Sequence, residues 1–449
     1  MDKKIHVIGG GLAGAEAAYQ AARLGVSVVL HEMKPNKKSP AHSLDLLGEL
    51  VCSNSFKAED LSTATGLMKE EMRRMGSLNI RIADETRIPA GGALAVDREL
   101  FAEKITKEIK ENPNIEIRYE EVNSVDELPE NTTVIIATGP LTSEGLLGNL
   151  SKQFGLTKLN FFDAAAPIVY RDSINMDIAF MAARYNKGTA DYINCPMNKE
   201  QYLAFCEALV NAETAEVHDF DKKMLYEGCM PIESMAHRGT DTMRFGPLKP
   251  VGLDNPDGSK NYAVVQLRRD DTDGKMYNIV GFQTRLKFSE QKRVFGMIPG
   301  LENAEFARYG VMHKNTYIKS PGVLDRTYEV TEPEKLGFGN RRVYFAGQIT
   351  GVEGYMESAN SGMVAGINAA REILGEEKFI LPRTTATGAL AAYVAEYKGE
   401  DFQPMGMNFG IIEETEEIAN RKFKKKDKKE HREAISEYAL SVIEELWNV

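Results

Sequence analysis

The chain has 449 residues, of which 43% are hydrophobic, and its formal net charge is −11 with a pI of about 5.4. This length allows two or three domains with cores of their own. No apolar run reaches the roughly 18 residues that a membrane-spanning helix needs, which argues against a membrane protein. The overall acidity argues mildly against a nucleic-acid partner, although a local basic patch is compatible with it.

Neither the cysteines nor the histidines follow a metal-binding pattern. The chain has four cysteines and seven histidines, without C-x-x-C or H-E-x-x-H spacing, so we expect no metal. Reduced thiols in a cytoplasmic protein are the simplest interpretation. The first apolar stretch already reads as a strand, and we therefore expect no signal peptide.

The N-terminal segment is typical of a dinucleotide-binding unit. An apolar strand at residues 5–8 runs into GGGLAG, a helix follows at 12–24, and a second strand at 26–31 ends at Glu32. The carboxylate of Glu32 lies 18 residues after Gly14, a spacing that suits hydrogen bonds from the ribose hydroxyls of a bound dinucleotide. The predicted cofactor-binding residues here are Gly9, Gly10, Gly11, Gly14 and Glu32.

A second unit of the same kind lies near the other end of the chain. Residues 343–346 read as a short buried strand, and a Gly-rich turn and a helix of small residues follow as far as residue 370. Such a helix points backbone N–H groups and a positive dipole end at whatever lies before it. Two such units indicate one discontinuous site around a large cofactor, and FAD fits best. A further buried strand, at 133–140, ends near a glycine, Gly139. The predicted cofactor-binding residues therefore also include Gly139, Gly347, Gln348 and Gly351.

The middle of the chain has a different character. Strands in meander order, such as 262–267 and 277–282, alternate with a helix at 198–211 and with dense turn signals. The predicted fold class is therefore α/β, with a discontinuous Rossmann-type FAD-binding domain at 1–165 and 325–449 and an inserted α+β domain at 166–324. The last part of the chain, 412–446, reads as helical.

The residues alone leave the role of the thiols open. Cys52 and Cys229 have polar, Gly or Pro neighbours that place them on loops, and Cys195 is expected at a strand end. Cys206 lies mid-helix among apolar residues and reads as a core residue. A cysteine is more often structural than reactive, so neither role is decided at this point.

A basic run stands near the C-terminus. Residues 421–432 hold eight Lys or Arg against two acids. This pattern is typical of a solvated helix face or a frayed loop, and it is equally compatible with contacts to nucleic-acid phosphates. Arg268 and Arg269 are weaker candidates for the same contacts.

Motifs along nearly the whole chain resemble one enzyme family. They include GGGLAGAEAA, PAHSLDLLGELVCSNSF, PAGGALAVDRELFA, EGCMPIE, YAVVQLRRDD and AGQITGVEGYMESANSGMVAGINAA. Together they resemble the TrmFO family, the folate- and FAD-dependent tRNA (uracil-5-)-methyltransferases. The longer flavoproteins that modify the tRNA wobble uridine share the opening and closing motifs. They carry a further C-terminal helical domain, for which this chain is too short.

The resemblance implies an activity and site residues. Methylenetetrahydrofolate would give its one-carbon unit to C5 of the uridine at position 54 in the tRNA T loop, with reduced flavin helping to carry and reduce it and NADPH or NADH as reductant. Cys52 and Cys229 both lie in family motifs, and we expect Cys229 to attack uracil C6 and Cys52 to support it. Tyr355 and His313 are aromatic candidates to stack on the folate or flavin ring, or simply packing residues. Gln348 stands where many flavoproteins have Asp, and the family shows the same Gln.

Three other functions fit parts of the pattern. A generic FAD/NAD(P)H oxidoreductase would explain both nucleotide motifs but neither the loop cysteines nor the basic run. A wobble-uridine modifier with a GTPase partner would need the further C-terminal domain. A flavin-holding RNA-binding or scaffold protein without catalytic activity would not turn over folate.

Overall fold

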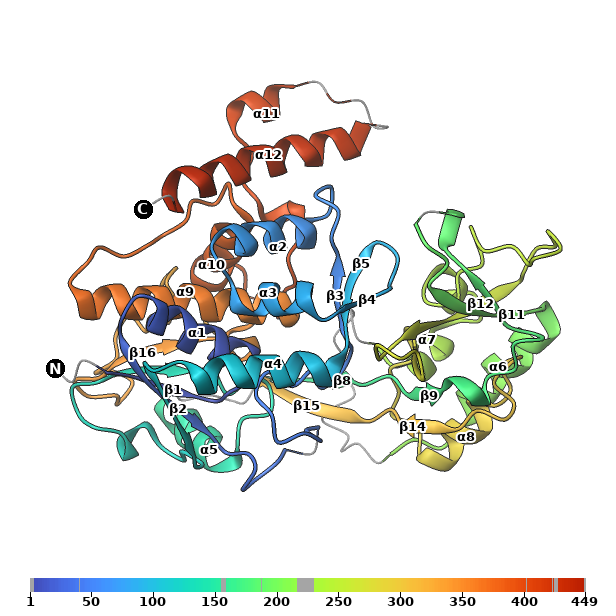
Figure 1. Ribbon diagram of the computed structural model, residues 1–449, viewed down its shortest axis with the longest axis horizontal. Helices are drawn as coiled ribbons and strands as arrows, with labels where there is room; N and C mark the ends of the chain where they lie inside the picture. Colours follow the sequence, from blue (N-terminus) through green and yellow to red (C-terminus); the bar gives the residue numbers. More distant parts are fainter. Residues whose placement is uncertain are drawn as a thin grey trace.

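The computed structural model describes residues 4–39, 41–154, 159–186, 188–215, 230–400, 402–421, 423 and 427–447. A five-stranded parallel sheet of order β16-β7-β1-β2-β6 forms the centre of the first domain (Figure 1). Four of its strands are almost wholly buried, as expected for parallel strands covered on both faces, whereas most residues of the edge strand β6 are exposed or half-buried. Their bounds are β1 (Lys4–Ile8), β2 (Ser27–Glu32), β6 (Ile115–Tyr119), β7 (Thr133–Ile136) and β16 (Arg342–Phe345).

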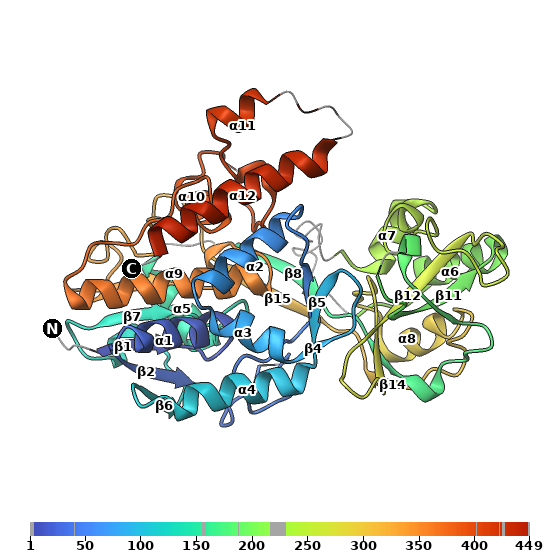
Figure 2. The same ribbon diagram turned by 45° about the horizontal axis from the view of Figure 1, so that its top comes forward.

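Two helices from opposite ends of the chain join the discontinuous halves of this domain. Helix α1 (Leu12–Arg23) and helix α9 (Tyr355–Leu374) lie side by side (Figures 1 and 2). Glycine makes this close packing possible, since a Cβ at Gly362 would lie 2.1 Å from the carbonyl oxygen of Ala13, and one at Gly366 would lie 2.5 Å from that of Ala17. The predicted Rossmann-type architecture, split between the two ends of the sequence, is confirmed.

Two buried glutamates hold helix starts in the first domain. Glu16 accepts hydrogen bonds from the backbone nitrogens of Leu78 (3.0 Å) and Asn79 (2.9 Å). Glu71 accepts them from Ala386 (2.7 Å) and Thr387 (2.8 Å). Carboxylates thereby satisfy N–H groups that helix starts leave without partners. The elements concerned are α2 (Ala64–Arg74), α3 (Leu78–Glu85) and α10 (Ala386–Glu396); the domain also contains α4 (Arg98–Glu111), α5 (Glu144–Gln153), β3 (Ser55–Ala58), β4 (Arg87–Ile88) and β5 (Ala93–Val96).

The second domain is built on a six-stranded sheet of order β10-β11-β12-β13-β9-β14. In Figure 2 this domain, green to yellow, lies beside the first. β8 (Leu159–Ala164) leads the chain into the second domain and β15 (Met312–Tyr317) leads it back, and these two strands form a separate antiparallel pair. The remaining elements are β9 (Ile168–Tyr170), β10 (Phe180–Ala182), β11 (Tyr192–Met197), β12 (Ala263–Arg269), β13 (Met276–Ile279), β14 (Phe306–Arg308), α6 (Lys199–Asn211), α7 (Ile232–Arg238) and α8 (Phe288–Phe295).

Two cysteines lie in the core of the second domain. Cys206 is buried in α6, as predicted. The expectation of a strand end at Cys195 is wrong, because the residue lies within β11, opposite Val265 of β12, and is fully buried. Burial raises the pKa of the Cys195 thiol to about 12. This thiol is therefore protonated at neutral pH and unsuited to nucleophilic attack.

Two helices are described in the C-terminal segment. Helix α11 (Glu416–Asn420) and helix α12 (Lys428–Trp447) are described, and α12 packs on α2 above the first domain (Figures 1 and 2). The prediction of helix over 412–446 is therefore confirmed for residues 416–420 and 428–446 and wrong for residues 412–415, 421 and 423. Lys422 and residues 424–426 of the basic run lie outside the described residues. Among the described residues, no helix is both long and apolar enough to span a membrane.

Candidate active site

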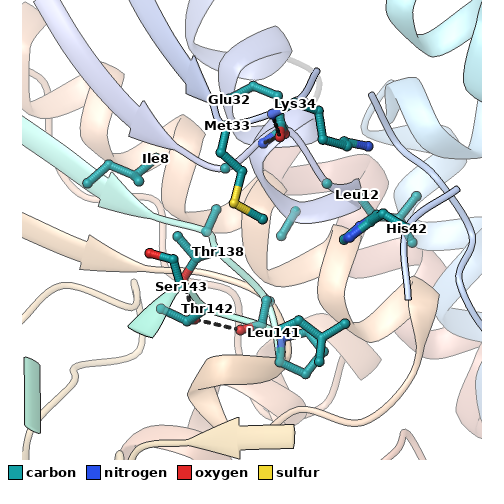
Figure 3. Close-up of a pocket in the computed structure, with 18 of the residues that line it drawn as sticks. Ile8, Leu12, Glu32, Met33, Lys34, His42, Thr138, Leu141, Thr142 and Ser143 are labelled. Atoms are coloured by element: carbon teal, nitrogen blue, oxygen red, sulfur yellow. Dashed lines mark hydrogen bonds between the residues drawn. The ribbon is translucent and has the colours of Figure 1, made fainter. Parts of the chain in front are cut away.

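A cavity lies where the sequence predicts the dinucleotide. It opens at the carboxyl ends of β1, β2 and β7, in front of the first turn of α1, which is where ligands bind in parallel α/β sheets. Figure 3 shows Met33 projecting from the end of β2 toward the segment that carries Thr138 and Ser143. Eight of the predicted residues line this cavity: Gly9, Gly10, Gly11, Glu32, Gly139, Gly347, Gln348 and Tyr355.

The walls of the cavity fit a dinucleotide such as FAD. Gly11 is the N-cap of α1 and forms no side-chain cap hydrogen bond, and a Cβ built on it would meet nothing within 4 Å. The first-turn N–H groups therefore face open space that a pyrophosphate could fill. Buried Glu32 accepts hydrogen bonds from the backbone nitrogens of Gly10 (2.8 Å) and Lys34 (2.9 Å). Each carboxylate oxygen keeps a lone pair for a ribose hydroxyl.

Two predicted glycines, Gly14 and Gly351, do not line the cavity but shape its walls. A Cβ at Gly14 would lie 1.8 Å from the carbonyl oxygen of Gly9, so only glycine allows α1 to approach the turn this closely. A Cβ at Gly351 would lie 2.5 Å from Cζ of Phe402. Substituting either residue would act on the shape of the site rather than on a ligand directly.

One wall of the cavity comes from a loop that the sequence did not reveal as a site. The loop after β2 folds back, and Lys34 and Glu49 both line the cavity, with 3.5 Å between Nζ and Oε2. Glu49 also accepts hydrogen bonds from the backbone nitrogen (2.7 Å) and hydroxyl (2.9 Å) of Ser43. His42 lines the cavity from the same loop (Figure 3). The sequence shows the polar residues of this loop, but it does not show that the loop folds back and brings them to the cavity wall.

A histidine at the end of β2 is a further lining residue that the sequence did not single out. His31 Nε2 lies 3.0 Å from His6 Nδ1, and His31 Nδ1 lies 2.8 Å from a carboxylate oxygen of Glu120. Burial lowers the pKa of His31, although Glu120 acts in the opposite direction. His31 is therefore neutral at physiological pH and hydrogen-bonded at both ring nitrogens.

The loop that carries Cys52 adjoins this cavity. Glu49 and Val51 line the cavity, and the hydroxyl of Tyr355 accepts hydrogen bonds from the backbone nitrogens of Cys52 (2.7 Å) and Ser53 (2.9 Å). Burial raises the pKa of Tyr355, so its hydroxyl stays neutral. The sequence pointed to Tyr355 as a stacking ring, and the structure adds that its hydroxyl holds the Cys52 loop at the start of α9.

The other predicted residues differ in how far the structure describes them. Gln348 lines the cavity, and its Nε2 donates to Oε2 of Glu353 at 2.5 Å. His313 lies in β15 opposite Asp163, and its side chain lies outside the described part of the chain. Cys229 lies outside the described residues altogether. Arg268 is buried, so it is not available to the phosphates of a large partner.

Comparison with known proteins places this architecture in a family. The model of the family described as glucose inhibited division protein A matches residues 4–377. A protein of Acetivibrio thermocellus named methylenetetrahydrofolate--tRNA-(uracil-5-)-methyltransferase TrmFO is 59% identical over 91% of this chain and 92% of its own length. A protein of the same name from Natranaerobius thermophilus is 54% identical over 98% of both chains. The chain belongs to the TrmFO family.

Solved structures support the fold of this TrmFO-family protein. The crystal structure of Aquifex aeolicus GidA superimposes with a TM-score of 0.68, at 18% identity, over 99% of this chain and 74% of that one. At this level of identity the likeness concerns the fold alone. It agrees with the discontinuous parallel-sheet domain and the second domain described above.

Proposed function

We propose that this protein is a methylenetetrahydrofolate--tRNA-(uracil-5-)-methyltransferase that forms 5-methyluridine at position 54 of the tRNA T loop. The observation that carries the proposal is the position of Cys52 in this member of the TrmFO family. Its loop forms part of the wall of a cavity whose glycine turn, helix start and buried carboxylate fit FAD. This reaction needs a redox cofactor and thiol chemistry in one place, and Cys52 is the family-motif thiol that the structure describes beside the cavity.

The reaction explains why a thiol is required. Uracil C5 is a poor nucleophile, but a thiolate that adds to C6 leaves an enolate whose C5 can attack the methylene carbon of the folate. Loss of the C5 proton to a base and cleavage of the bond between the methylene carbon and the folate nitrogen leave an exocyclic methylene group on C5. Addition of a hydride to this carbon completes the methyl group and expels the thiolate from C6. Cysteine suits the first step because its thiolate is intrinsically nucleophilic. We assign the attack to Cys229 and a supporting role to Cys52.

The cavity residues would hold FAD, which would supply the reducing equivalents when bound. Gly9, Gly10 and Gly11 with the start of α1 would bind the pyrophosphate, and Glu32 the ribose. Gln348 and Tyr355 would contact the flavin end, because they lie at the α9 side of the cavity, where the Cys52 loop is held. NADPH or NADH would re-reduce the flavin.

The basic run at 421–432 would contact tRNA phosphates, which are the part of an RNA that lysine recognises regardless of sequence. The last five residues of the run, 428–432, form the start of α12, which packs on α2 of the first domain. His313 would stack on the folate or flavin ring. A tRNA substrate implies that the protein works in the cytoplasm.

The proposal is tested by a methylation assay on an unmodified tRNA transcript with folate, FAD and NADPH each omitted in turn. Loss of 5-methyluridine on each omission is expected. If the protein oxidises NADPH but never modifies tRNA, a generic flavin oxidoreductase is the better description. If the modification appears at the wobble uridine, the alternative tRNA-modifying function is correct.

A further inference from the structure

Two arginines of the second domain reach the Cys52 loop of the first. Arg268 in β12 donates from Nη2 to Oγ of Ser53 at 2.7 Å and from Nε to Oδ1 of Asn54 at 3.1 Å. Arg308 at the end of β14 donates from Nη2 to the carbonyl oxygen of Val51 at 2.7 Å. Hydrogen bonds from the second domain therefore hold the residues on both sides of Cys52.

A third arginine reaches the same loop from the first domain. Arg98 at the start of α4 donates from Nη1 to the carbonyl oxygen of Leu50 at 2.9 Å and from Nη2 to Oδ1 of Asp270 at 2.9 Å. Asp270 is itself buried and belongs to the second domain. The three guanidinium groups thus come from α4, β12 and β14 and meet at residues 50–54.

Positive charge is in excess around this loop. Asp270 forms an ion pair with Arg98, and in the described part of the chain neither Arg268 nor Arg308 has an acid within 4 Å. Arginine keeps its proton at any accessible pH, so these cations persist. The other ionisable groups that face the loop do not cancel them, since Tyr355 is neutral and Glu49 is paired with Lys34.

Two of the three arginines, Arg98 and Arg308, are electrostatically coupled to Cys52. Burial lowers the pKa of Arg308, and the charge of Cys52 acts in the opposite direction. Burial also lowers the pKa of Arg98, but the Asp270 carboxylate, with a smaller effect from Cys52, outweighs it and leaves the pKa raised. Such coupling is mutual, so a cation that a thiolate stabilises also stabilises the thiolate.

We propose that Arg98, Arg268 and Arg308 are positioning residues that hold the Cys52 loop across the two domains and favour the thiolate form of Cys52. This inference rests on the proposed function for the use of that thiolate. It explains why one buried and two half-buried arginines converge on five residues of loop. A loop that needed only anchoring could be held by neutral donors, without the desolvation that each buried guanidinium costs.

The test is alkylation of Cys52 by iodoacetamide in the FAD-loaded protein, followed by mass spectrometry of the Cys52 peptide at a series of pH values. Arg308 is the best position to vary, because it is only half-buried and lies on an edge strand. Arg308→Gln keeps an N–H donor but removes the charge, and Arg308→Lys keeps the charge. The matched control is Arg293→Gln, which removes an exposed arginine of the same domain that is paired with Glu290.

Alkylation in Arg308→Gln should slow about tenfold at neutral pH, with the midpoint of its pH dependence about one unit higher. Arg308→Lys and Arg293→Gln should follow the wild-type profile. Methylation by Arg308→Gln should show a lower kcat with an unchanged KM for tRNA.

An unchanged alkylation profile in Arg308→Gln would overturn the inference. So would equal slowing at every pH in both the Gln and the Lys variants, because that result would assign the arginine to loop shape alone. Alkylation needs neither tRNA nor folate. A wild-type protein that fails to methylate tRNA would therefore contradict the proposed function without altering this measurement.

Discussion

The hydroxyl oxygen of Tyr355 lies 2.7 Å from the backbone nitrogen of Cys52, 303 residues away in the sequence. This hydrogen bond joins the start of α9, from the second FAD-binding unit, to the loop that follows the first. It makes the position of the thiol depend on both ends of the chain. The neighbouring nitrogen of Ser53 donates to the same oxygen at 2.9 Å.

Tyr355→Phe should disturb the position of the Cys52 thiol without removing FAD. The variant leaves two partly buried N–H groups without an acceptor, which costs about 1–3 kcal/mol of unfolding free energy. Methylation kcat should fall by about one to two orders of magnitude, because small displacements of a reacting group are costly. FAD content and kcat are the measurements. Tyr393→Phe, which removes the hydroxyl bonded to Gln403, is the control and should keep its activity. Wild-type kcat in Tyr355→Phe would refute a role for this hydrogen bond.

Gly11→Val should fold but bind FAD poorly. A side chain at Gly11 meets no protein atom within 4 Å and would fill the space in front of α1. Flavin absorbance per protein should therefore drop while the melting temperature of the FAD-free protein is retained. Gly92→Val, at another position without neighbours within 4 Å, should keep its flavin. Full flavin retention in Gly11→Val would remove the assignment of this turn to the pyrophosphate.

Because of Lys69, the unfolding free energy of the protein should change with pH in the alkaline range. Burial lowers the pKa of this lysine from 10.5 to about 8, although Nζ donates to the carbonyl oxygens of Phe56 and Ala58. Between these pH values the unfolded chain binds more protons than the folded one, so stability rises with pH. The unfolding free energy should gain roughly 3 kcal/mol over this window relative to Lys69→Met. Urea titrations of both proteins at a series of pH values measure this difference in unfolding free energy. The same dependence of unfolding free energy on pH in both proteins would contradict the lowered pKa.

Replacing Lys424, Lys425 and Lys426 by alanine should weaken tRNA binding. The log–log salt dependence of the binding constant should flatten by roughly one slope unit per lost phosphate contact. FAD content should not change. An unaltered slope would identify the run as a solvated surface.

The thiols should differ in their effect on covalent chemistry. A tRNA with 5-fluorouridine in the T loop should form a stable adduct with the wild-type protein, since fluorine cannot leave as a proton does. Cys229→Ala should lose this adduct and methylation while still binding FAD and tRNA, because the lost group acts only in the covalent step. Cys52→Ala should be severely impaired in methylation.

Cys206→Ala is the control for these thiols, since it removes a core thiol and should keep activity at some cost in stability. An adduct that forms in Cys229→Ala but not in Cys52→Ala would reverse the two roles. Near wild-type methylation by both variants would refute the covalent mechanism.

The parts of the fold that the sequence predicted well are those with local signals. Residues 5–24 and 343–370 each combine a buried apolar strand, a glycine turn and a helix within about thirty positions, and both units were predicted nearly where the structure has them. Glu32 follows from the same local spacing. These features needed no knowledge of the rest of the chain.

The wall around Cys52 could not be predicted in the same way. Its hydrogen bonds join Val51 to Arg308 and Ser53 to Arg268 across more than two hundred residues. The sequence around each arginine carries no sign of its partner, because the contact arises only when the two domains pack together. An arginine in a strand pattern therefore reads as a surface residue until the fold is known.

Cys195 shows how a local rule can mislead. Pro196 follows it directly, and proline normally marks the end or edge of a strand. In the structure β10 pairs with β11 from Tyr192 to Asn194, so among the described residues β11 has no partner on that side at Pro196. Its other side continues to pair with β12 as far as Met197. The strand therefore tolerates the proline, and Cys195 is buried within it.

The most direct test of the proposed function follows the carbon atom itself. The protein is incubated with FAD, NADPH, methylenetetrahydrofolate labelled with ¹³C at the methylene carbon, and either an unmodified tRNA transcript or one with cytidine at position 54. The label should appear as a 5-methyl group on one uridine of the first transcript and be absent from the second. A first transcript without label, or equal labelling of both transcripts, would contradict the assignment of this protein as a folate-dependent methyltransferase of the T-loop uridine.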